Sequence, residues 1–381
     1  MTDTLREHYR RQEFAEAVAR HIYLNHAGVA PSPARVVRAV QEAVALAGRD
    51  PIRFFLEGVA VARDSARARL ARLMGVPAEH LALVKNTGHA LSIVADGLIL
   101  EPGDNVVLAA CDYPAVVYPW YAQEWRGVET RLVPPRADDT LSPDDFAAVM
   151  DSRTRVLSLS WVQFGTGYRA DLAAFAELAR SHGAVFIVDV IQGLGALPLD
   201  SSALGLDVVA TGAHKWLMAP GGTGGLYIAP PVLDRMRLVN MGALSVVDAA
   251  KFDPLEFTPK PNAQRYEEGT PNGLGLIGLE AALSLIEEAG MDAIAARVLA
   301  VAAHAAEALT RKGYVVTSPQ DDAHRSGIVM FRHPILDNDP VLQALEAAGV
   351  AAAVRGGKLR FSPHFYNTEE EIDRAVAALP E

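Results

Sequence analysis

The chain has 381 residues, half of them hydrophobic (50%), which is typical of a soluble enzyme, and a formal net charge of −11. Its length predicts a large α/β domain with a smaller domain beside it. The acidic balance, without a long basic run, argues against nucleic acid or an anionic membrane as partner.

The cysteine content and the apolar runs indicate the cellular compartment in which the protein is expected. Cys111 is the only cysteine, which excludes an intrachain disulfide and a cysteine-based metal site, and no metal is expected. The N-terminus has acids and no apolar core, and no stretch reaches the ~18 consecutive apolar residues of a membrane span. We therefore expect a cytoplasmic protein.

The first third of the chain alternates helices with polar turns. Helices are predicted over 5–20, 33–47 and 57–74, and a polar turn follows residue 25. The apolar run Leu81–Val84 precedes Asn86-Thr87-Gly88, which opens a helix to about residue 99. The free amides of such a helix start can hold an anion, but a plain N-cap by Asn86 or Thr87 explains the same residues.

The middle of the chain predicts a mostly parallel sheet with helical crossovers. Strand-like runs fall at 105–110, 129–133, 155–161, 184–190, 207–211 and 224–229, with helices at about 142–150 and 171–182. Ligands of such sheets bind beyond the carboxyl ends of the strands. Candidates at or just after strand ends are Asn86-Thr87, Tyr113, Gln163, Asp189 and Lys215, so we expect them at one edge.

The last part of the chain predicts a smaller α+β unit. A helical stretch over 273–311, broken near Gly290, leads to strands at 314–317, 327–331 and 358–362 and to helices at 339–348 and 368–379. We assign residues 22–260 to the large domain. Residues 1–21 and 273–381 form the small domain, and residues 261–272 form a connecting loop.

Asp189 and Lys215 carry the chemistry that the sequence suggests. Asp189 ends a run that is expected to be buried, and a buried carboxylate needs a cation such as a protonated pyridine nitrogen, an arginine, or a helix start to cap. Lys215 follows a strand, and a desolvated amine there can form a Schiff base with an aldehyde, whereas the alternative is a surface lysine. Dinucleotide binding is set aside because the third glycine position after Gly193 and Gly195 is Pro198.

These residues stand in motifs of a known family. The runs Asp189-Val190-Ile191-Gln192 and Thr211–Trp216, with Gly269-Thr270-Pro271 and Leu359–Thr368, resemble the class V aminotransferases. That family includes cysteine desulfurases, selenocysteine lyases, kynureninases and isopenicillin N epimerase-like proteins. The resemblance covers about residues 22–378. It implies an α/β fold type I enzyme, pyridoxal 5′-phosphate (PLP) as cofactor, and a homodimer with shared active sites.

The resemblance also implies roles for individual residues. Lys215 would bind the cofactor as a Schiff base and shuttle protons, and Asp189 would pair with its ring nitrogen. The remaining cofactor contacts would be Gln192 and Gln163 to the phenolic oxygen, Tyr113 stacked on the ring, Thr87, Gly88 and His214 at the phosphate, and Thr270 from the other subunit. Gln163 departs from the family's asparagine. Arg360 would bind the substrate α-carboxylate, and His26 would line the substrate mouth.

Transamination, β-elimination and epimerisation begin in the same way: an amino acid bound to the cofactor as an external aldimine loses its α-proton. The residues named above would serve all three reactions. We place aminotransferase first because it needs only Lys215, and a β-lyase on a sulfur or selenium amino acid or an epimerase second. Persulfide formation is not expected, because residues 351–358 carry no cysteine where desulfurases have their nucleophile. A PLP-binding protein without turnover is the alternative of another class.

Overall fold

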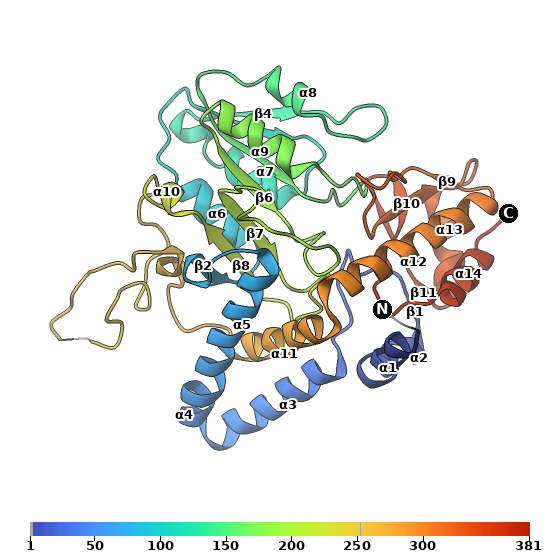
Figure 1. Ribbon diagram of the computed structural model, residues 1–381, viewed down its shortest axis with the longest axis horizontal. Coiled ribbons are helices and arrows are strands. Elements are labelled where there is room, and N and C mark those ends of the chain that lie inside the picture. Colours follow the sequence, from blue (N-terminus) through green and yellow to red (C-terminus); the bar gives the residue numbers. More distant parts are fainter. Residues whose placement is uncertain (1–2, 252) are drawn as a thin grey trace.

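The computed structural model describes residues 3–251 and 253–381. Its centre is a seven-stranded sheet in which only β8 runs against its neighbours, as a mostly parallel α/β fold requires (Figure 1). In spatial order the strands are β2 (Leu81–Val84), β8 (Gly224–Ile228), β7 (Val208–Gly212), β6 (Val185–Asp189), β5 (Thr154–Ser160), β3 (Asn105–Ala109) and β4 (Glu129–Val133). Most of these strands are continuous buried runs, because helices cover both faces.

Alternate residues of each central strand enter different cores. Val106 and Leu108 of β3 lie in the cluster that contains α6 (Thr87–Gly97) and α7 (Pro114–Tyr121). Val107 and Ala109 lie in the cluster on the other face. That second cluster includes residues of α5 (Ala60–Met74), α8 (Pro143–Ala147), α9 (Leu172–Ser181) and α11 (Gly273–Ala289).

The N-terminal helices are more broken than the sequence predicts. The expected helix over 5–20 is two helices, α1 (Asp3–Glu13) and α2 (Ala15–Arg20), because Phe14 leaves the helical conformation at φ −124°. After α3 (Ala34–Arg49), the expected helix over 57–74 starts earlier, as α4 (Pro51–Arg53) and a π-helical turn that lead into α5. Single helical turns also occur at Ala78–His80, Glu124–Arg126 and Ala263–Tyr266, and α10 is Pro230–Leu233.

A second, four-stranded antiparallel sheet forms the smaller unit at the right of Figure 1. Its order is β12 (Ala353–Arg355), β13 (Lys358–Phe361), β10 (Val329–Arg332) and β9 (Val315–Val316). The helices around it are α12 (Met291–Arg311), α13 (Asn338–Ala347) and α14 (Glu369–Ala377). The sequence did not predict β12, or the two-residue parallel pair of β1 (Ile22–Tyr23) with β11 (Val350–Ala351), since such short strands have too little periodicity.

The packing of α11 differs from the expected domain boundary at residue 273. This helix packs against α3 and α5, and its Leu276 and Leu279 share a buried cluster with Val36 and Leu70. At Gly290, with φ 80°, the chain turns into α12, which runs toward the smaller sheet (Figure 1). Ile294 and Val298 of α12 still lie in the same core, and Val301 is the first to enter the core of the smaller unit. The large unit therefore includes α11, because its apolar face is buried there.

One described helix, α12, is long and apolar enough to cross a membrane. Half of that apolar stretch is buried inside the protein, where Val301 and Leu309 pack against strand residues such as Leu359. A core helix passes the same test of length and composition, so α12 is explained by its packing.

Candidate active site

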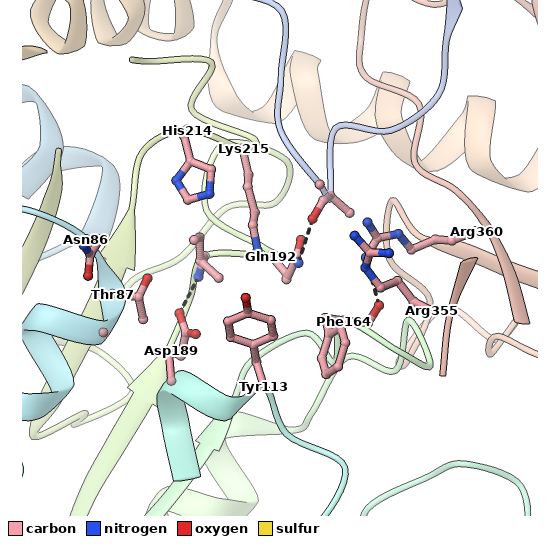
Figure 2. A pocket seen from close by; sticks show the side chains of 15 residues that line it. Asn86, Thr87, Tyr113, Phe164, Asp189, Gln192, His214, Lys215, Arg355 and Arg360 are labelled. Carbon is pink, nitrogen blue, oxygen red and sulfur yellow. Dashed lines mark hydrogen bonds between the residues drawn. The ribbon is translucent and has the colours of Figure 1, made fainter. Parts of the chain in front are cut away.

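A cavity of about 360 Å³ opens at the carboxyl ends of the central strands (Figure 2). Its walls come from both units and from the segment that follows β1. The lining residues are Ala27, Gly28, Asn86, Thr87, Gly88, Tyr113, Ala115, Phe164, Asp189, Ile191, Gln192, His214, Lys215, Arg355 and Arg360. Most candidates predicted at strand ends line this one cavity, as expected for a parallel sheet: Asn86-Thr87, Tyr113, Asp189 and Lys215. Gln163 is the exception, because it does not line the cavity.

Asp189 is a buried carboxylate without a basic partner. It ends β6 with 2% of its surface exposed, and its Oδ1 accepts a hydrogen bond from the Ile191 amide at 2.9 Å. No ion pair to Asp189 is found in the described part of the chain. Burial raises its pKa to about 7, although the Ile191 amide and Lys215 act in the opposite direction. A cation at this position, such as a protonated ring nitrogen, would compensate the burial.

Lys215 is held in the same cavity with its amine largely desolvated. Its side chain is 9% exposed, and Nζ lies 5.4 Å from the centre of the Tyr113 ring. Burial lowers its pKa to about 8; Asp189 opposes this shift, and Arg360 and Arg355 add to it. A lysine whose pKa lies this low has a substantial neutral fraction near neutral pH, so it can attack an aldehyde.

The start of α6 offers an anion site with an unsatisfied donor. Asn86 caps the helix by accepting a hydrogen bond from the His89 amide at 2.8 Å, which confirms the N-cap interpretation. Thr87 does not cap the helix, and its Oγ1 is buried in the cavity wall without a hydrogen-bond partner. An unpaired hydroxyl beside free helix amides fits a phosphate group, and Gly88 and His214 line the same end.

Gln192 has a fixed orientation in the wall. Its Oε1 accepts from Trp216 Nε1 at 3.0 Å, and its Nε2 donates to the Ala27 carbonyl at 3.0 Å. Trp216 is fully buried directly after Lys215, so the indole couples the lysine loop to Gln192. One N–H of the amide remains for a ligand in the cavity. The predicted contact of Gln192 with a phenolic oxygen is compatible with this geometry and stays a prediction.

Tyr113 lines the cavity, but Gln163 does not. The Tyr113 ring meets Phe164 edge-on at 5.3 Å between centroids. Gln163 is fully buried behind it, and its Nε2 donates to Asp112 Oδ2 at 3.2 Å. Asp112 also accepts from the Ser160 amide at 2.9 Å. The expected contact of Gln163 with the cofactor is thus replaced by a supporting role, since its amide is used to satisfy a buried carboxylate.

Arg360 faces the cavity from β13, as the sequence predicts. It is 1% exposed, its guanidinium donates to the Phe164 carbonyl at 3.1 Å and to Asn25 Oδ1 at 3.2 Å, and its Nε has no partner. Burial lowers its pKa to about 10, and repulsion from Arg355 adds to this. Neither of its two acceptors carries a charge, so the guanidinium can still bind an anion.

His26 does not line the substrate mouth. Its ring is fully buried, with Nδ1 2.9 Å from the Ser362 carbonyl and Nε2 2.8 Å from the Tyr366 hydroxyl. The next residues, Ala27 and Gly28, line the cavity instead. The difference arises because pairing with residue 362 turns the imidazole into the core.

Thr270 lies outside this cavity, on an exposed stretch that lines a neighbouring hollow with Lys85 and Glu268. Its proposed contact from the other subunit stays a prediction. Sequence reasoning missed several lining residues, among them Phe164 and Arg355. Arg355 had a signal, because Gly356-Gly357 between two strand-like stretches is typical of a hairpin, and a hairpin would set residue 355 near Arg360.

Comparisons with known proteins find one family across most of the chain. A family model described as aminotransferase class-V matches residues 22–375. The chain is 28% identical to a probable cysteine desulfurase of Methanothermobacter thermautotrophicus, over 95% of this chain and 94% of that protein. It is 31% identical to isopenicillin N epimerase of Streptomyces clavuligerus, over 94% of each. The solved structure of the cysteine desulfurase CsdA from Escherichia coli has a TM-score of 0.86 at 27% identity, covering 98% of this chain and 97% of that one.

Proposed function

Because the chain belongs to the class V aminotransferase family, whose members are PLP-dependent enzymes, we propose that it is an aminotransferase that removes the α-proton of an amino acid. The observation that carries the proposal is Lys215, the only lysine among the described residues that line the cavity, whose largely buried amine lies 5.4 Å from the centre of the Tyr113 ring. A single base at this place suffices to take a proton from one carbon and return it to another.

We assign a different role in the reaction to each of the main residues of the cavity. When bound, PLP supplies an aldehyde and an electron-withdrawing ring. Asp189 would keep a proton on the ring nitrogen, and Thr87 with the α6 amides would hold the phosphate. Arg360 would bind the substrate α-carboxylate by two parallel hydrogen bonds, and this binding would orient the Cα–H bond. Lys215 would then accept the α-proton on its neutral Nζ.

A second candidate is a lyase that removes the β-substituent of a sulfur amino acid. It is favoured by the relatives that are named cysteine desulfurases. Cys111 is half-buried, its Sγ contacts Gln163 Oε1 at 3.6 Å, and burial raises the pKa of its thiol to about 12. It does not line the cavity, and residues 351–358 contain no cysteine. These facts support release of the sulfur product over its capture by a thiol of this chain.

The first experiment is the absorbance of the purified, cofactor-loaded protein, compared with Lys215→Ala and with Lys251→Ala as an exposed-lysine control. We expect the band of the lysine-bound cofactor in the wild type and the control only. A colourless wild type, or a band that survives in Lys215→Ala, would contradict the proposal.

The second experiment is a product assay on a panel of amino acids, with and without an added keto acid. Amino-group transfer that depends on the keto acid supports the aminotransferase. Release of ammonia and a keto acid without an acceptor supports the lyase, and an inverted amino acid supports an epimerase like the relative from Streptomyces clavuligerus. Cofactor binding without a response to any amino acid would support a protein without turnover.

A further inference from the structure

Two arginines lie on the same face of one hairpin. In the antiparallel pair of β12 with β13, Ala353 is opposite Arg360 and Arg355 is opposite Lys358. Alternation along β12 puts Ala353 and Arg355 on one face, so Arg355 and Arg360 are diagonal neighbours on it. Val354 and Leu359 point to the other face and pack in the core of the small unit. The hairpin therefore directs both guanidiniums toward the cavity that they line.

The hairpin that carries Arg355 is held by contacts with both units. Lys358 forms an ion pair with Asp139, and Asn338 Nδ2 donates to the Gly357 carbonyl at 2.8 Å. A Cβ added to Gly356 would lie 3.4 Å from the Gly165 carbonyl oxygen, so the tip of the hairpin rests on that turn. The backbone of Arg355 is thus placed by contacts of its turn, while its side chain is exposed at the rim of the cavity, where a ligand can reach it.

The charges at this end of the cavity are not balanced. No carboxylate pairs with Arg355 or Arg360 in the described part of the chain, and Arg355 Nη1 donates to the Val354 carbonyl at 2.7 Å. Figure 2 shows both arginines on the opposite flank from Thr87 and Asp189. A phosphate held at Thr87 would therefore lie away from them, and one α-carboxylate would neutralise only one guanidinium.

From this arrangement we propose that the preferred amino acid carries a second carboxylate in its side chain, and that Arg355 binds it while Arg360 binds the α-carboxylate. This inference rests on the proposed function, and it names the substrate class. Two guanidinium groups on one sheet face, each with a planar pair of N–H donors, fit two planar carboxylates of one molecule. Arg355 is then a residue that determines specificity, since it contacts the part of the substrate that does not react.

The test measures binding without turnover. Succinate and glutarate have two carboxylates and no amine; succinamate and glutaramate replace one carboxylate by an amide of nearly equal size. We expect calorimetry on the cofactor-loaded protein to show that each diacid binds about 10-fold to 100-fold more tightly than its amide. In Arg355→Gln this preference should fall to about 3-fold or less, with little change for the amides.

Two further variants serve as controls. Arg332→Gln removes an exposed arginine of the same sheet that does not line the cavity, and it should retain the full preference. Arg355→Lys keeps the charge without the fork and should retain part of it. Equal affinity for diacids and amides in the wild type, or a preference unchanged in Arg355→Gln, would overturn the inference. Because these acids lack an amine, that outcome leaves the absorbance and product assays of the proposed function unaffected.

Discussion

The substitution Asp189→Asn is expected to stabilise the cofactor-free protein while it damages the enzyme. Asp189 is 2% exposed, and burial is the largest cause that raises its pKa from 3.8 to about 7. An acid whose folded pKa is raised stabilises the fold most below its unfolded pKa, and the contribution is lost as pH rises through the folded value. The asparagine has no charge to bury, and its amide oxygen can still accept from Ile191.

The size of the effect follows from the two pKa values. The raised pKa of Asp189 lowers the unfolding free energy by about 2 kcal/mol at about pH 5 and by about 4 kcal/mol at about pH 8, relative to an acid with the same pKa in both states. The advantage of Asp189→Asn over the wild type should therefore grow by about 2 to 3 kcal/mol across this range. PLP should reduce or reverse the advantage, because a charged ring nitrogen compensates the wild-type carboxylate and gains nothing from the amide.

The assay is chemical denaturation of both apoproteins at equal concentration, at about pH 5 and about pH 8, repeated with saturating PLP. Titrations of other groups largely cancel in the difference between the two proteins. A difference in unfolding free energy that does not change with pH, or an apoprotein that Asp189→Asn destabilises at the higher pH, would refute the description of Asp189 as a buried charge that awaits a cation.

Three further outcomes are expected. Thr87→Val removes a hydroxyl that has no partner, so it should leave the stability of the apoprotein nearly unchanged while PLP affinity falls about 10-fold in a fluorescence titration; a stability loss with unchanged affinity would contradict the phosphate assignment. Because the Lys215 pKa is lowered to about 8, the rate of PLP capture in stopped flow should rise up to about that pH and then level, and a continued steep rise toward the ordinary value of 10.5 would show that the amine is not desolvated. Gly195→Ala adds a Cβ 2.5 Å from the Trp216 carbonyl oxygen at φ 96°, so it should lower the unfolding free energy by about 3 kcal/mol, while Gly221→Ala, with open space around it, should not.

The sequence predicted the cavity residues that follow strands of the central sheet better than those from other segments, for a physical reason. Asp189 and Lys215 follow strands of a mostly parallel sheet, and the geometry of that sheet brings strand ends together whatever the rest of the chain does. Thr87 and Tyr113 follow the same rule. Local pattern was enough here, because each residue is placed by its own strand.

The residues that were misplaced depend on partners far along the chain. Gln163 follows β5 but turns away from the cavity to satisfy Asp112, a buried acid whose environment is not visible in the pattern. His26 points inward because it pairs with the Ser362 carbonyl, 336 residues away. Arg355 reaches the cavity through a three-residue strand that periodicity does not reveal. Such placements are set by long-range packing, which propensity does not encode.

The walls of the cavity are made at different times during synthesis of the chain. The residues proposed to hold PLP, from Thr87 to Lys215, lie at the edge of a sheet whose last strand ends at Ile228. The substrate end cannot form before β13 has been synthesised, because Asn25 forms a β-bridge with Ser362 and accepts a hydrogen bond from Arg360. Domains fold as their residues leave the ribosome. On the proposed assignment, the residues for the cofactor are therefore synthesised before the hairpin that would select a substrate, and release of the C-terminal hairpin completes the cavity.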